Sequence, residues 1–160
     1  MPCAKWRRAL PTAAKLARQA AEAALVQSGK RPRIGRGAAA ELSIVLADNA
    51  TVQELNARWR GKDAPTNVLA FASDETTVAG QPILLGDVVL AYETVAAEAK
   101  QQGKALADHF RHLVIHGVLH LLGYDHVVAA PARRMEALEK RILASLGIAD
   151  PYRIGEMPDG

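Results

Sequence analysis

The sequence is poor in cysteine, aromatic residues and long apolar runs, and each shortage removes a class of protein. Its 160 residues include one cysteine, Cys3, so no disulfide framework exists and a reducing, cytoplasmic setting is expected. No apolar run approaches the roughly 18 residues that a transmembrane helix needs, so we expect no membrane partner. Aromatic residues make up only 4% of the chain, too few for a base-stacking platform. A nucleic acid would therefore be held mainly through its phosphate backbone.

The chain also lacks internal repeats and glycine-rich phosphate loops of the Walker or dinucleotide type. What it has is ordinary for a globular protein: 49% hydrophobic and 23% charged residues. This length and composition predict a single domain over residues 1–160, with 1–10 and 151–160 irregular.

Positive charge is concentrated near the start of the chain. The net charge is +3 and the pI 9.2, a mildly basic balance that is compatible with nucleic acid. No acidic residue precedes Glu22, while the same segment contains Lys5, Arg7, Arg8, Lys15 and Arg18. Such a start is typical of a basic helix, here with Pro11 near its first turn, or of an organelle transit peptide. A second basic run, KRPRIGRG, is predicted to be a loop that is either solvated or in contact with RNA.

The hydrophobic periodicity predicts an α+β fold, a small mixed sheet packed with about five helices. Strands are expected at Glu41–Ala47, Val68–Phe71 and Ile83–Ala91, the last with a bulge at Gly86. Five helices are expected: Thr12–Gln27, Thr51 to Gly61, Tyr92–Gln102, the histidine-rich segment capped by Asp108, and Pro131 to Gly147. The second begins with a capping box at Thr51–Glu54 and is expected to place Leu55 and Trp59 inward.

The segment HGVLHLLGYDH, residues 116–126, is the most informative part of the sequence. His116 and His120 are four residues apart, so on a helix they share a face. Gly123 then permits a left-handed turn that can return His126 to the same point. The spacing matches that by which zinc proteases of the metzincin type gather three imidazoles. We predict one zinc ion held by His116, His120 and His126, with its fourth position open for chemistry.

The glutamate that serves as base in HExxH proteases is missing, because Gly117 follows the first histidine. Ordinary zincin peptidase chemistry is therefore disfavoured. His109 and His112 also lie near the face of His116 and could replace a ligand on spacing alone, although a supporting or surface role is preferred. Asp87 could either cap backbone amides or lie near the metal.

Three blocks closely resemble the YbeY family of metal-dependent endoribonucleases: RHLVIHGVLHLLGYDH, LNARWRGKDAPTNVLAF and LLGDVVLAYETV. The resemblance covers roughly residues 41 to 152 and implies a single-strand-preferring endoribonuclease. Its partners would be ribosomal RNA and the small ribosomal subunit, in RNA maturation and ribosome quality control. The resemblance also implies a functional role for Arg60, otherwise expected to pair with Asp63 on the surface. Arg60 would bind phosphate and act with His116 in catalysis.

Two departures from the family accompany this resemblance. The family commonly has Pro-Thr-Asp where this chain has Asn67, which removes a charge but keeps a hydrogen-bonding side chain. Members usually begin with a strand before a tryptophan that Trp6 matches. Here the strand is lost or the translated start lies downstream of the true one, and an unpaired sheet edge would favour association.

Two other functions remain open on the residues alone. One is a zinc hydrolase of another class, such as a peptidase with an unusual base. The other is a non-catalytic ribosome-binding factor in which zinc only fixes the turn at Gly123.

Overall fold

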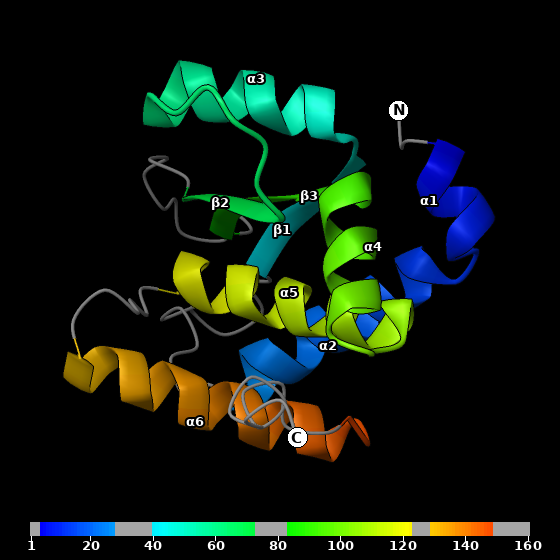
Figure 1. Cartoon of the computed structure of the whole chain (residues 1–160). Helices are drawn as coiled ribbons and strands as arrows, with labels where there is room; N and C mark the ends of the chain where they lie inside the picture. Colours follow the sequence, from blue (N-terminus) through cyan, green and yellow to red (C-terminus); the bar gives the residue numbers. More distant parts are fainter. Residues whose placement is uncertain (1–3, 28–39, 73–82, 123–128, 149–160) are drawn as a thin grey trace.

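The computed structural model describes residues 4–27, 40–72, 83–122 and 129–148, which form six helices around one three-stranded mixed sheet (Figure 1). The elements are α1 (Ala4–Ala9), α2 (Ala13–Gln27), β1 (Ala40–Ala47), α3 (Asn49–Arg60), β2 (Val68–Ala72), β3 (Ile83–Ala91), α4 (Tyr92–Gln101), α5 (Leu106–Leu121) and α6 (Ala129–Ser145). The α+β prediction is confirmed. The additional helix is α1, in a segment expected to be irregular.

The sheet has the strand order β1-β3-β2, with β1 parallel and β2 antiparallel to the central β3. The pairing of β1 with β3 shifts register where Leu84 and Gly86 face consecutive residues of β1, which confirms the predicted bulge. Gly86 has a φ of 139°, and a Cβ there would lie 2.0 Å from the carbonyl oxygen of Phe71. Only glycine permits this close approach of β2 to β3.

The two faces of the sheet are covered differently. Helix α3 lies over one face, where Val52 packs with Leu69 and Val89. Helix α5 lies across the other face and contacts α2, α4 and α6 as well (Figure 1). It is buried on several sides, with Val114, Ile115 and Val118 fully enclosed. Helix α5 is therefore the centre of the larger core, and its histidines are fixed by that packing.

The N-terminal segment is tied into this core through Trp6. Its side chain is fully buried and packs against Phe110 and Tyr92. The indole Nε1 donates a 2.9 Å hydrogen bond to the carbonyl oxygen of Ala47, so its one polar atom is satisfied.

Three local predictions were wrong. Helix α3 begins one turn earlier than the Thr51–Glu54 pattern indicates, because the Asp48 side chain accepts from the amide of Thr51. Trp59 is 65% exposed, although Leu55 does pack inward beside the sheet. Asp108 lies inside the first turn of α5 and pairs with Arg111, while the N-cap is Ala105.

The remaining boundaries agree closely with the sequence pattern. Gly61, Gly103 and Gly147 follow the ends of α3, α4 and α6, each with a φ between 65° and 77°. No helix in the described ranges is long and apolar enough to cross a membrane.

Asp48 provides a test of how α3 begins. Replacing Asp48 by Ala removes the acceptor for the Thr51 amide and should lower the free energy of unfolding by about 1 kcal/mol. Asp48→Asn retains a capping oxygen and should lose much less. Urea unfolding followed by circular dichroism measures both, and equal losses would contradict the capping role.

Candidate active site

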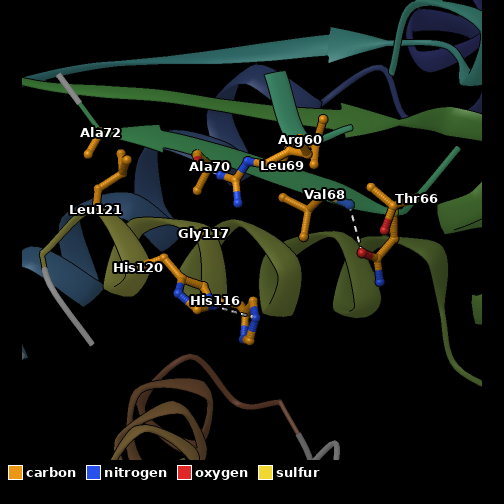
Figure 2. Close-up of a pocket in the computed structure, with 11 residues that line it drawn as sticks. Arg60, Thr66, Val68, Leu69, Ala70, Ala72, His116, Gly117, His120 and Leu121 are labelled. Atoms are coloured by element: carbon orange, nitrogen blue, oxygen red, sulfur yellow. Dashed lines mark hydrogen bonds between the residues drawn. The ribbon is translucent and has the colours of Figure 1, made fainter. Parts of the chain in front are cut away.

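A cleft of about 480 Å³ lies between β2 and α5. One wall consists of β2 and the residues before it, and the other consists of His116, Gly117, His120 and Leu121 of α5. Arg60 stands at the β2 side, across from the two histidines (Figure 2). The cleft thus brings together residues that are 56 and 60 positions apart in the sequence.

The segment between α3 and β2 is held at several points. Gly61 adopts a left-handed conformation that ends α3. Asn56, 5% exposed, donates from Nδ2 to the carbonyl oxygen of Ala64 over 2.8 Å. Gln53 donates to Asp63 over 3.0 Å. These hydrogen bonds therefore fix the conformation of the segment that leads into the cleft wall.

Arg60 is the last residue of α3 and is held against β2. Its Nη2 donates to the carbonyl oxygen of Ala70 over 2.6 Å, and its guanidinium lies 5.2 Å from the centre of the Phe71 ring. Asp63, the alternative partner considered from the sequence, instead accepts from Gln53. The guanidinium has five N–H groups, so donors remain for an anion in the cleft.

His116 and His120 lie side by side on α5, as their spacing predicts (Figure 2). Their Nε2 atoms are 3.1 Å apart. The opposite nitrogen of His116, Nδ1, lies 2.5 Å from Oε1 of Glu139 on α6. Since a carboxylate can only accept, Nδ1 carries a proton, and in the neutral ring Nε2 then keeps its lone pair. That lone pair faces His120.

Glu139 is a fully buried carboxylate. Burial alone would raise its pKa, but His112 and His116 together hold the pKa at about 2. The group is therefore ionised at neutral pH. A buried negative charge needs positive charge nearby, and a cation bound to His116 would supply it. The donor set and this carboxylate fit a metal site.

Two groups of side chains could hold that metal. In the first, His112, His116 and Glu139 offer ligand atoms within 4.8 Å of one another. The second uses the Nε2 atoms of His116 and His120, which line the cleft. Glu139 has no exposed surface, so an ion beside it would have no open position for substrate. We therefore favour the Nε2 side, where Glu139 orients His116.

The comparisons with known proteins decide the family. The family described as Endoribonuclease YbeY matches residues 5–147. This chain belongs to that family. The match confirms the resemblance carried by the three sequence blocks and the expected enzyme class, a metal-dependent endoribonuclease.

Curated relatives agree over most of the chain. It is 57% identical to Endoribonuclease YbeY of Paramagnetospirillum magneticum, over 95% of this chain and 92% of that protein. The identity to Endoribonuclease YbeY of Methylocella silvestris is 49%, over 88% and 80% of the two chains. The solution structure of TM1509 from Thermotoga maritima is similar in fold, with a TM-score of 0.54 and 21% identity over 92% of each chain.

Other predicted site residues have different outcomes. His126 and Gly123 lie outside the described residues, as does the basic run KRPRIGRG. Asp87 is exposed and alternates with the buried Val88, so it lies on the α3 face, away from the histidines. His109 is 3% exposed and the His112 side chain 12% exposed, so neither is a surface residue.

Glu139 and Glu98 were missed from the sequence. Glu139 occurs at helical spacing with Met135, Leu138 and Ile142, which line the core. A carboxylate on an apolar stripe requires a buried partner, and that anomaly was the available signal. Its partner, His116, is 23 residues away in the sequence, so the pairing needed the fold.

Gly117 has a steric role that explains the missing base. A Cβ at this position would lie 2.7 Å from Cγ1 of Val88, in the centre of the sheet. The side chain of a glutamate here would collide with β3, so the position supplies close packing.

Substitution of Gly117 tests this packing. Gly117→Ala should lower the free energy of unfolding by about 1–3 kcal/mol, because the added methyl group overlaps Val88. Adding Val88→Ala creates space and should make the double variant less destabilised than the sum of the single changes predicts. Chemical denaturation of the four proteins measures this coupling, and simple additivity would contradict direct contact.

Proposed function

We propose that the protein is a zinc-dependent endoribonuclease that cleaves single-stranded RNA during ribosomal RNA 3′ end maturation and ribosome quality control. The supporting observation is the cleft in which Arg60 faces the paired Nε2 atoms of His116 and His120. Curated relatives named Endoribonuclease YbeY at 49–57% identity support the choice of RNA as substrate. Ribosomal RNA and the small ribosomal subunit are the proposed partners, in the cytoplasm.

In this proposal His116, His120 and His126 hold one zinc ion. Bound zinc supplies Lewis acidity, which polarises a phosphoryl oxygen and lowers the pKa of water. Glu139 keeps the proton of His116 on Nδ1 and fixes the direction of the ring. His116 thereby has both a structural and a catalytic role.

Arg60 supplies the second positive group of the proposed mechanism. Its guanidinium is held by Ala70 and Phe71 before substrate arrives, so little reorganisation is needed when a phosphate enters the cleft. Charge that develops on the phosphoryl oxygens is then stabilised by the remaining N–H donors. Gly117 cannot accept a proton, so no base stands at the position that the glutamate occupies in HExxH proteases.

The metal ligands can be distinguished by substitution. His120→Ala should abolish stoichiometric zinc binding, whereas His112→Ala should retain it, because the Nε2 atom of His120 lies beside Nε2 of His116 and His112 lies on the side of Glu139. Glu139→Ala should weaken zinc binding about 10- to 100-fold by releasing the His116 ring. Chelator competition and metal analysis of the purified proteins give these values.

The control for this experiment is Glu136→Ala, one turn earlier on α6, which should bind zinc as tightly as the wild type. Circular dichroism identifies any variant that does not fold. Loss of zinc from His112→Ala together with normal binding by His120→Ala would instead favour the His112, His116 and Glu139 group.

RNA cleavage tests the function itself. Arg60→Glu should reduce cleavage of single-stranded RNA at least about 100-fold, because it replaces a hydrogen-bond donor to the phosphate by a negative charge that repels the phosphate. Arg58→Glu is the matched control, since Arg58 is exposed on the same helix and does not line the cleft. Its activity should remain within about three-fold of the wild type. Equal losses in both would indicate a general charge effect.

Chelation separates the metal from the function. Cleavage should disappear on treatment with a chelator and return on addition of zinc. A wild-type protein that binds zinc stoichiometrically and leaves RNA intact would overturn the proposed activity but retain the metal site.

A further inference from the structure

Behind the cleft, the carboxylate of Glu98 on α4 joins two elements of the active site. Its Oε1 lies 3.0 Å from Nδ2 of Asn67, which lines the cleft just before β2. The same oxygen lies 2.9 Å from Nε2 of His109 on α5. The carboxylate thus connects the β2 wall to the helix of the proposed metal ligands.

His109 is built to hold this carboxylate. It is 3% exposed, and because a carboxylate only accepts, Nε2 carries the proton. Its Nδ1 is buried with no hydrogen-bond partner among the described residues. Burial lowers the pKa of His109 and so favours the neutral ring. The nearby carboxylate of Glu98 opposes this effect but does not cancel it. The described contacts assign no other polar partner to the ring, so orienting Glu98 is its visible role.

Asn67 is fixed by hydrogen bonds to three partners. Its Nδ2 donates to Oε1 of Glu98 over 3.0 Å and to Oε2 over 3.4 Å, and its Oδ1 accepts from the amide of Val68 over 2.7 Å. Its backbone oxygen accepts from the amide of Ala91 at the end of β3. The amide group therefore has one allowed orientation, set by the carboxylate at one end and the start of β2 at the other.

We propose that Glu98 is a positioning residue of the cleft, acting through Asn67 on the β2 wall. His109 and His116 are seven residues apart on α5, about two helical turns. The link from His109 through Glu98 to Asn67 therefore sets the place of β2, and of Arg60 bonded to Ala70, relative to His116. This role of Glu98 rests on the proposed RNA cleavage. It gives Asn67 a structural role in the cleft wall for which a carboxylic acid at position 67 is not required.

The pair can be tested by exchanging donor and acceptor. Asn67→Asp places two carboxylates about 3.0 Å apart and removes the donor to Glu98. When Glu98→Gln is added, its oxygen in the place of Oε1 still accepts from His109, and its amide nitrogen in the place of Oε2, which lies 3.4 Å from the side chain of Asn67, can donate to the new carboxylate at position 67. The oxygen at position 67 also still accepts from Val68. We expect kcat/KM for RNA cleavage to fall at least about 10-fold in Asn67→Asp and to return to within about three-fold of the wild type in the double variant.

A pH series distinguishes positioning from a general loss of structure. In Asn67→Asp the paired carboxylates raise one carboxyl pKa, so the defect is present above that raised pKa and is relieved as the pH falls through it. The other titratable groups near the pair are His109 and, close to that ring, Lys104 and His112. Cleavage by zinc-loaded Asn67→Asp, relative to wild type at each pH, should rise toward acid. The ratio for the double variant should stay level.

The matched control is Gln101→Glu, at an exposed position of α4. Like Asn67→Asp it adds one negative charge, but it lies outside the cleft wall and should leave kcat/KM unchanged. A double variant no better than Asn67→Asp, in proteins shown to be folded, would overturn the proposal. Thermal unfolding of the same variants is a second readout: the Tm lost in Asn67→Asp should return in the double variant, even if the wild type cleaves no RNA. A wild type that cleaves no RNA would reject the proposed activity. A Tm that does not return in the double variant would reject the link between Glu98 and Asn67.

Discussion

The close contact between helix α5 and the central strand β3 is the constraint on which the site depends. Gly117 allows the helix to approach Val88 more closely than any residue with a side chain would. This approach fixes the height of α5 over the sheet, and the cleft occupies the space between that helix and β2. Gly117 also distinguishes the site from HExxH proteases, because close packing requires glycine at the position where those proteases have the glutamate base.

Two buried or partly buried carboxylates then fix the histidines of α5 from outside the helix. Glu98 on α4 accepts from His109, and Glu139 on α6 accepts from His116. An imidazole on a helix can rotate about its side-chain bonds, and each such hydrogen bond selects one orientation and one tautomer. Helices α4 and α6 therefore have a function besides closing the core: each positions one ring of the central helix. The cost of burying the Glu139 charge is offset by its two histidine neighbours and, in the proposed enzyme, by the metal.

Much of this arrangement could be predicted from the sequence, because it depends on local periodicity. All three strands were found within a residue of their ends, and the glycines that follow α3, α4 and α6 were recognised. The His116 and His120 pair follows from helix geometry alone. Trp59 was misplaced because its spacing continues the apolar face of α3, and spacing does not reveal that this position lies largely exposed. Asp48 was overlooked because two adjacent polar patterns competed for the start of one helix.

The contacts between distant segments could not be predicted in this way. The approach of Arg60 to Ala70 depends on how α3 crosses the sheet, and the pairing of Glu139 with His116 depends on how α6 lies against α5. A sequence pattern identifies a carboxylate on an apolar helix face as unusual, but only packing shows which group neutralises it. The same distinction separates the two possible metal groups. Both contain His116, and they differ in which of its nitrogens binds, because Glu139 occupies Nδ1 whereas His120 and the cleft lie on the side of Nε2. The Nε2 atoms line the cleft, whereas Glu139 has no exposed surface, so access for substrate favours the Nε2 side in the proposed enzyme, with Glu139 orienting the ring.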